Sequence, residues 1–196
     1  MKIGLFFGSF NPVHVGHLII ANFMATQTDL EKVWLVVSPQ NPLKPKKTLA
    51  RDADRLHLVR LAIDGNPKLK ASDIEFGLPK PSFTVDTLAF LREKHPEHEF
   101  VLLMGGDNLA SFKLWKNWET ILAGHEIFVY RRPKIELGDL AAHPKVKLFE
   151  APMLDISATF IRECLKNGKS IRYLVVDSVF EEVAAARLYK LDNAGI

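Results

Sequence analysis

The sequence predicts an α/β fold: a Rossmann-like doubly wound parallel sheet with a small C-terminal helical tail. Short apolar runs alternate with segments of helical periodicity along most of the chain, which is the order of parallel strands joined by crossover helices. Several of these runs are apolar almost throughout, as expected for strands buried on both faces. With 196 residues, 47% of them hydrophobic, the chain can build one core. We expect a single domain over residues 1–196, whose tail begins at about residue 170.

The individual elements follow from the same patterns. The expected strands are 2–7, 32–37, 69–74, 99–104, 126–130 and 146–149. The expected helices are 18–26, 51–63, 85–94, 109–123 with a break near Trp115, 158–167 and 179–188. The helix at 158–167 has the clearest boundaries, because Ser157 can cap its start and Gly168 can take the left-handed conformation after its end.

Composition and charge exclude several classes of protein. Lys and Arg number 26 against 23 Asp and Glu, and the resulting net charge of +3 does not indicate a dedicated nucleic-acid binder. The apolar stretch at 3–7 is too short to span a membrane. Cys164 is the only cysteine, so neither an internal disulfide nor a cysteine-rich zinc site can form. We expect a cytoplasmic protein with no membrane or nucleic-acid partner, and its oligomeric state, including a homo-oligomer, stays open.

The loop after the first strand combines small residues with two histidines. It reads Gly8-Ser9-Phe10-Asn11-Pro12-Val13-His14-Val15-Gly16-His17. Gly8 and Gly16 let a phosphate approach the backbone, and the following helix start supplies free N–H groups and partial positive charge. His14 and His17 project from one side of the first turn. Nucleotide phosphate binding is the favoured interpretation. The alternatives are a zinc site, for which no third local ligand is present, and two hydrogen-bonded structural histidines.

Two other segments complete a set with this loop: Ser82-Phe83-Thr84-Val85-Asp86-Thr87-Leu88 and Ile156-Ser157-Ala158-Thr159-Phe160-Ile161-Arg162. The first loop and the distal segment together resemble the paired signature of the HxGH nucleotidyltransferase superfamily. The middle segment and the chain length are similar to bacterial nicotinate-nucleotide adenylyltransferases. The resemblance covers the chain from residue 1 to about residue 185, apart from an uninformative stretch at 131–147. It implies an enzyme that transfers AMP from ATP to nicotinate mononucleotide and releases pyrophosphate.

The distal segment has the residue types of a second anion site. Ser157 and Thr159 place two hydroxyls on the opening turn of a helix, and Arg162 lies within reach of that turn. An ordinary N-cap beside a solvated arginine is the alternative interpretation. The family more often has Ser where Ala158 stands, so a hydroxyl contact is missing there while the backbone N–H remains.

The middle segment lies where a loop turns into a helix, and its hydroxyls and free N–H groups favour a carboxylate over a carboxamide. The resemblance therefore implies that Ser82 and Thr84 recognise nicotinate, with Asn11 also assigned to the acceptor. A simple helix cap at Thr84 is the alternative. The resemblance points to Trp115 as the residue that stacks on the cationic pyridinium ring. Trp118 is expected in the core.

The fourth strand is followed by Gly105, Gly106 and Asp107, where the backbone can approach a nucleoside. We expect the Asp107 carboxylate both to accept hydrogen bonds from the nucleoside and to cap the next helix. Lys44, in the loop after the second strand, is a candidate for the triphosphate, although a solvated basic loop is an equal alternative. Cys164 is expected to fill the core. The full set assigned to ATP is Gly8, Ser9, Phe10, Gly16, Lys44, Gly105, Asp107, Ile156, Ser157 and Thr159.

The resemblance also implies the catalytic roles. His17 would contact the α-phosphate in the transition state, His14 the phosphate cluster, and Arg162 with Ser157 and Thr159 the outer phosphates. Mg²⁺ should arrive with ATP, and no protein metal ligand is expected. The alternatives are an adenylyltransferase for nicotinamide mononucleotide or phosphopantetheine, and a nucleotide sensor or RNA-binding module without catalysis.

Overall fold

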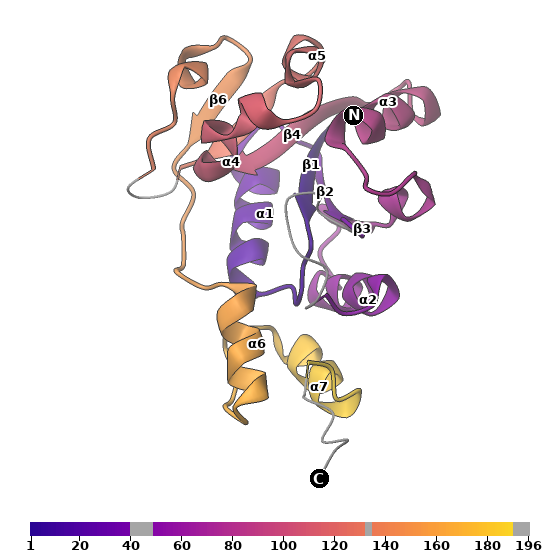
Figure 1. The fold of residues 1–196 in the computed structure, drawn as a ribbon, viewed down its shortest axis with the longest axis vertical. Coiled ribbons are helices and arrows are strands. Elements are labelled where there is room, and N and C mark those ends of the chain that lie inside the picture. The colour runs from indigo at the N-terminus through magenta and orange to yellow at the C-terminus, as the bar shows by residue number, and fades with distance from the viewer. Residues whose placement is uncertain (40–48, 132–134, 190–196) are drawn as a thin grey trace.

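The computed structural model describes residues 1–39, 49–131 and 135–189, and its centre is a six-stranded parallel sheet (Figure 1). The strands are β1 (Lys2–Gly8), β2 (Lys32–Val37), β3 (Leu69–Ser72), β4 (Glu99–Gly105), β5 (Ile127–Tyr130) and β6 (Val146–Phe149). They lie in the order β3-β2-β1-β4-β5-β6, and every neighbouring pair is parallel. This is the strand order of a doubly wound Rossmann-like fold, so the predicted fold class is confirmed.

Helices cover both faces of this sheet. One face packs against α1 (Val15–Gln27), α2 (Asp52–Ala62), α6 (Ala158–Lys166) and α7 (Asp177–Ala185). The other face packs against α3 (Thr84–Lys94), α4 (Gly106–Ala110) and α5 (Trp118–Gly124). Short 3-10 segments lie at η2 (Ile74–Gly77), η3 (Phe112–Leu114) and η4 (Asp139–Ala142). Successive side chains of a strand point to opposite faces of the sheet. Leu5 therefore belongs to the apolar cluster on one face and Phe6 to the apolar cluster on the other.

Most element boundaries agree with the sequence to within one or two residues, and the exceptions have local causes. The strand expected at 69–74 ends at Ser72, because Ile74 begins η2. Helix α1 starts at Val15 and not at residue 18, since its first turn is built from the glycine and histidine of the motif and carries no apolar periodicity. The break near Trp115 is present, with α4 and η3 before it and α5 after it. Helix α7 runs two residues earlier at its start and ends at Ala185, three residues before the expected end.

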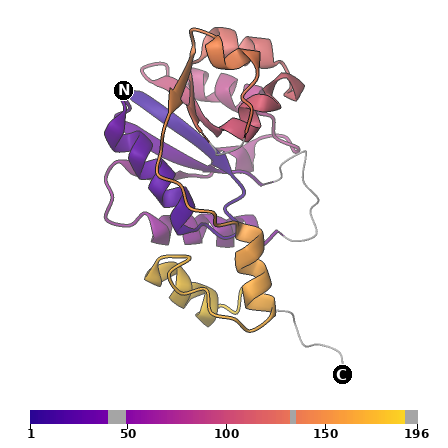
Figure 2. The ribbon, with the colours of Figure 1, turned by 90° about the vertical axis from the view of Figure 1, so that its left-hand side faces the viewer.

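The helical tail docks beside the start of α1 and along α2. The backbone N–H of Val15 donates to the carbonyl of Leu174, 3.0 Å away, and the Ser178 hydroxyl donates to the carbonyl of Leu61 at 3.2 Å. Figures 1 and 2 both show α6 and α7 at one end of the molecule, beyond α1 and α2. Within the described ranges, no helix combines the length and the apolar character needed to cross a bilayer.

Candidate active site

The site forms where the chain leaves β1 and β4. From β1 the chain continues into α1 on one face of the sheet, and from β4 it continues into α4 on the other face. β1 and β4 are neighbouring strands, so the loops after them diverge at the point where open parallel sheets bind ligands. The loop of residues 9–14 and the turn at Gly105 are therefore placed together at this edge.

The first loop doubles back tightly after β1. Phe10 has a positive φ of 44° and its ring is buried in the core, edge-on to the His17 ring at 5.0 Å. A Cβ atom at Gly8 would lie 2.8 Å from the Phe10 ring, so only glycine fits there. With the Phe10 ring turned inward, this residue presents only its backbone to a ligand.

The two histidines of the motif form one unit at the start of α1. Their rings stack at a centroid distance of 3.7 Å, and His14 is the N-cap residue, only 6% exposed. The backbone N–H of His14 donates to Nδ1 of His17 at 3.3 Å. Because Nδ1 accepts this bond, the proton of a neutral His17 ring is held on Nε2. His17 therefore carries a fixed N–H donor on the side away from its own helix turn.

The distal segment meets the first loop directly. Nη1 of Arg162 donates to the carbonyl of Asn11 at 2.8 Å, across 151 positions of sequence. Its Nη2 donates to the Thr159 hydroxyl at 3.2 Å. The predicted cap is present, since the backbone N–H of Phe160 donates to Oγ of Ser157 at 3.1 Å. The starts of α1 and α6 are thus joined through one guanidinium, which places both anion-attracting helix ends and a fixed positive charge in the same region.

Arg55 contacts the motif loop, and no sequence motif predicted this contact. Its side chain is fully buried, and its Nη1 donates to the carbonyls of Ser9 at 2.6 Å and Ser38 at 2.8 Å. Its Nε donates to the carbonyl of Ala50, and its Nη2 pairs with the Asp52 carboxylate at 2.6 Å. One guanidinium therefore joins the motif loop, the end of β2 and the start of α2. The available signal was a charged residue among the apolar positions of helix 51–63.

Asn11 has a structural contact beside its expected role. Its Oδ1 accepts a hydrogen bond from the backbone N–H of Ala50 at 3.1 Å. This contact ties the motif loop to the approach of α2, close to the carbonyls that Arg55 binds. The amide oxygen thus braces the loop in this arrangement, and the backbone carbonyl of the same residue accepts from Arg162.

Tyr189 lies near Arg55 and Arg162, and no sequence motif predicted this position. Its hydroxyl is buried and has no hydrogen-bond partner among the described residues. Burial raises the pKa of this phenol above its usual range, although the guanidiniums of Arg55 and Arg162 act in the opposite direction. Tyr189 is therefore a protonated hydroxyl within the electrostatic reach of both arginines.

The expected acceptor residues gather at the start of α3. Thr84 is its first residue, preceded by Phe83 as N-cap, and the Ser82 hydroxyl is buried with no partner among the described residues. Lys116 joins this start to the segment that carries Trp115, because its ammonium lies 2.9 Å from the Asp86 carboxylate and 4.6 Å from the centre of the Phe83 ring.

Both tryptophans flank Phe112, at 5.4 Å for Trp115 and 6.3 Å for Trp118, and both are partly buried against the core. The indole of Trp118 thus packs at the core, as expected. Trp115 lies one residue before the lysine that contacts α3, so the residues assigned to the pyridine ring come from adjoining segments.

The turn after β4 differs in detail from the expected cap. Gly105 is the N-cap of α4 and Asp107 lies in its first turn, so Asp107 is not the capping residue. A Cβ atom at Gly105 would lie 2.5 Å from Oδ1 of Asp107 and 3.1 Å from the Tyr130 ring. The aspartate side chain is folded back over the glycine, so Gly105 and Gly106 are buried while Asp107 is exposed.

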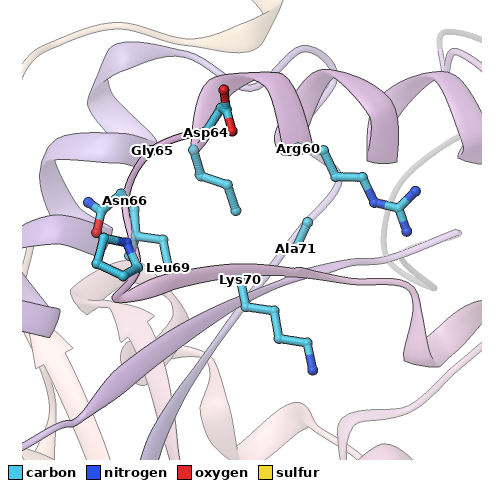
Figure 3. Close-up of a pocket in the computed structure, with 9 residues that line it drawn as sticks. Arg60, Asp64, Gly65, Asn66, Leu69, Lys70 and Ala71 are labelled. Atoms are coloured by element: carbon cyan, nitrogen blue, oxygen red, sulfur yellow. The ribbon is translucent and has the colours of Figure 1, made fainter.

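Other expected residues lie elsewhere. Lys44 falls outside the described residues. Cys164 is buried on α6, as expected for a core filler. A hollow of about 440 Å³ lies between the end of α2 and the start of β3, lined by Arg60, Asp64, Asn66, Leu69 and Lys70 among others (Figure 3). This hollow is at the amino edge of the sheet, opposite the histidine motif, and it carries none of the motif residues.

The fold and the joined helix starts define an α/β nucleotidyltransferase. The chain matches the cytidylyltransferase-like family over residues 5–164. It is 56% identical over 189 residues to a probable nicotinate-nucleotide adenylyltransferase of Cytophaga hutchinsonii, covering 96% of this chain and 98% of that protein. A Flavobacterium psychrophilum protein of the same description is 53% identical, with 97% and 100% covered. The chain therefore belongs to the cytidylyltransferase-like family and, within it, to the nicotinate-nucleotide adenylyltransferases.

Solved structures support the fold. Nicotinic acid mononucleotide adenylyltransferase of Plasmodium falciparum, complexed with NaAD, superposes with a TM-score of 0.81 over 96% of this chain and 97% of that chain, at 20% sequence identity. A nicotinate-nucleotide adenylyltransferase structure from Vibrio parahaemolyticus gives a TM-score of 0.71 at 22% identity, with 96% and 94% covered. The Rossmann-like architecture is thus retained where few side chains are shared.

Proposed function

We propose that this enzyme transfers AMP from ATP to nicotinate mononucleotide, giving nicotinate adenine dinucleotide and pyrophosphate. The observation that carries the proposal is the hydrogen bond from Arg162 to the Asn11 carbonyl, which puts both halves of the nucleotidyltransferase signature in one place. Relatives that are more than half identical over nearly their full length carry the same activity in their names. We also propose that residues 1–196 act as one domain, because Val179 and Val183 of the tail belong to the same apolar cluster as the sheet.

The proposed reaction does not require a general base. The attacking group is the phosphate monoester of the acceptor, whose second pKa is about 6, so it is largely deprotonated at neutral pH. Catalysis then consists of holding two anionic groups in line and stabilising the charge that develops as pyrophosphate leaves. Fixed N–H donors and guanidinium groups supply this without proton transfer.

His17 is the group assigned to the reacting α-phosphate. The hydrogen bond at its Nδ1 keeps the opposite nitrogen as a donor, so the ring need not reorient during reaction. His14, stacked on it, is assigned to the phosphate cluster. Ile156, Ser157 and Thr159 with Arg162 are assigned to the outer phosphates, where the start of α6 adds free backbone N–H groups. Gly8, Ser9, Phe10 and Gly16 offer their backbone to the same nucleotide.

Mg²⁺ enters with ATP in this proposal. The side chains assigned to the triphosphate are imidazoles, hydroxyls and a guanidinium, with no carboxylate among them, so they do not form a protein cage for a hard cation. They do fit an ion that is bound through substrate phosphates and water. When bound, the ion would neutralise phosphate charge, while the residues of this chain orient the phosphates.

The two nucleosides take the remaining groups. Gly105 and Asp107 are assigned to the ATP nucleoside, since the turn after β4 carries an exposed aspartate at the carboxyl end of the sheet. Ser82, Thr84 and Trp115 are assigned to the nicotinate moiety, and Asn11 is assigned to the same acceptor. The buried, unpartnered Ser82 hydroxyl supports this assignment, because a buried hydroxyl without a partner is costly unless a ligand binds it. Lys44 remains a proposed triphosphate contact.

Pyrophosphate release tests the proposed reaction. Purified protein is incubated with Mg²⁺–ATP and one of three acceptors: nicotinate mononucleotide, nicotinamide mononucleotide or phosphopantetheine. We expect the highest kcat/KM with nicotinate mononucleotide. A higher value with either other acceptor would assign the enzyme to that substrate, and ATP binding without release in all three assays would make it a sensor.

Thr84→Ala is expected to narrow the preference for nicotinate over nicotinamide mononucleotide. The hydroxyl at the start of α3 favours a carboxylate, so its loss should affect the acid substrate more than the amide. The measurement is the ratio of kcat/KM for the two acceptors, with a fall of about tenfold expected. Thr26→Ala is the matched control, since that exposed hydroxyl donates to the Asn22 carbonyl and accepts from the Gln27 side chain, both on α1. An unchanged ratio in Thr84→Ala would show that the carboxylate is recognised elsewhere.

A further inference from the structure

A group of metal-binding side chains lies at the turn between α3 and β4, and the proposed reaction does not use it. Nδ1 of His95 is 3.6 Å from Oε1 of Glu97, and Nε2 of His98 is 3.3 Å from the same oxygen. The three potential ligand atoms all lie within 4.8 Å of one another. Two imidazole nitrogens and a carboxylate oxygen therefore converge on one point.

The backbone and the neighbouring rings hold this group in place. The N–H of His98 donates to the carbonyl of His95 at 3.1 Å, which closes the turn around Pro96. The two imidazoles are parallel to within 7° at a centroid distance of 5.4 Å, and both are edge-on to Trp34, at 5.7 and 6.3 Å. Phe100 closes the cluster beneath them. These contacts hold the His98 ring, which is 11% exposed, more firmly than the His95 ring, which is 28% exposed.

Charged groups of both signs lie around this turn. His95 is the C-cap of α3, where the partial negative charge of the helix end lies. The Glu97 carboxylate faces both rings. The terminal ammonium of Met1 donates to the Glu97 carbonyl at 3.3 Å and is also 3.9 Å from the Glu31 carboxylate. The Lys70 ammonium lies 4.1 Å from the centre of the Trp34 ring, against which both imidazoles pack. The helix end and the carboxylate thus favour a cation, and the two ammonium groups act against it.

The group is separate from the proposed active site. β4 begins at Glu99, directly after the turn, and ends at Gly105 beside the nucleotide residues. The two sites therefore lie at opposite edges of the sheet. The half-exposed Glu97 side chain leaves room for water to complete a coordination shell.

We propose that His95, Glu97 and His98 form a binding site for a borderline divalent transition ion of the Zn²⁺ type. Two imidazoles and one carboxylate are the ligand set of such ions, and water would take the fourth position. Mg²⁺ and Ca²⁺ prefer sets made of oxygen alone. Because the rings are parallel in this structure, one must turn for both nitrogens to face a single ion, and the more exposed His95 ring is the one with room to turn.

The test is a competition titration of untagged, chelator-treated protein with Zn²⁺ and a chromophoric chelator at pH 7.5. We expect one equivalent to bind, no competition from Mg²⁺, and a d–d absorption band when Co²⁺ replaces Zn²⁺. Glu97→Gln and His98→Ala should each weaken binding at least tenfold, and Zn²⁺ should raise the Tm of the unaltered protein but not of these variants. Glu97→Gln changes an exposed side chain, so it keeps the test valid if His98→Ala fails to fold.

Two control variants locate the ion. His57→Ala removes an imidazole from another His–Glu pair, 3.6 Å from Glu182 on α7, and should leave affinity unchanged. His17→Ala removes one histidine of the stacked pair at the start of α1 and should also leave the Zn²⁺ affinity unchanged. The proposal would be overturned by unsaturable binding, or by a Zn²⁺ affinity in Glu97→Gln and His98→Ala equal to that of the unaltered protein. A loss of Zn²⁺ affinity in His17→Ala would also overturn it. Turnover of Glu97→Gln should equal that of the unaltered protein, which separates this site from the proposed reaction.

Discussion

His17→Ala should lower kcat by at least about a hundredfold, equivalent to roughly 3 kcal/mol of transition-state stabilisation. The His17 ring is fixed by the bond from the His14 N–H and by the edge of Phe10, so it offers a preorganised donor. In the proposed reaction, alanine removes that donor from the place where charge develops on the α-phosphate. The KM for ATP should change less than kcat, because the donor acts mainly in the transition state.

Steady-state pyrophosphate release at saturating substrates measures this effect, and the Tm of each variant checks the fold. His17→Gln keeps an N–H donor near the same position and is expected to recover part of the lost activity. His57→Ala, an exposed imidazole on α2, serves as the control and should retain full activity. Normal turnover in His17→Ala would remove the central role given to this residue.

Arg55→Ala is expected to reduce the free energy of unfolding by about 3–5 kcal/mol, since it removes a fully buried guanidinium and leaves its backbone partners unsatisfied. The carbonyls of Ser9 and Ser38 would each lose a charged donor inside the protein, and Asp52, one third exposed, would keep only its ion pair with Lys80 in the described part of the chain. The motif loop would also lose its attachment to β2 and α2, so kcat/KM should fall even at temperatures where the variant is folded.

Urea unfolding followed by circular dichroism measures the stability change, and pyrophosphate release at low temperature measures the second effect. Arg55→Lys keeps the charge but not the planar set of donors, so an intermediate loss is expected. Arg60→Ala is the matched control on the same helix, because this exposed side chain pairs, among the described residues, only with Asp73 at 3.8 Å. It should shift stability by no more than about 0.5 kcal/mol. Equal stability of Arg55→Ala and Arg60→Ala would contradict the bracing role.

The sequence predicted the fold well because its strongest signals are local. Buried strands such as β2 and β4 are nearly continuous apolar runs, and their bounds follow from composition alone. The motif residues were also readable, because glycine, histidine and hydroxyl residues stand out directly after strands. The resemblance joins the two motif segments in one signature, and the hydrogen bond from Arg162 to the Asn11 carbonyl shows that they are in contact.

Arg55 and Tyr189 were not predicted, and the reason is physical. The partners of Arg55 are mainly backbone carbonyls in three separate segments, and a carbonyl leaves no mark in the amino-acid sequence. Tyr189 comes near both arginines only after the tail has docked on α2, so no spacing rule connects them. The cap after β4 was misassigned to Asp107 because a glycine N-cap followed by an acidic first turn has nearly the same sequence pattern as an aspartate cap.

The junction between the first loop and α6 has a consequence for how the protein is made. All six strands have left the ribosome once residue 149 has emerged, but the guanidinium that meets the Asn11 carbonyl is at residue 162. Every strand of the sheet is therefore synthesised before the two segments assigned to the phosphates can meet. Their junction can form only during the last quarter of translation, and a chain that stops just after β6 would lack the arginine that the proposed reaction uses.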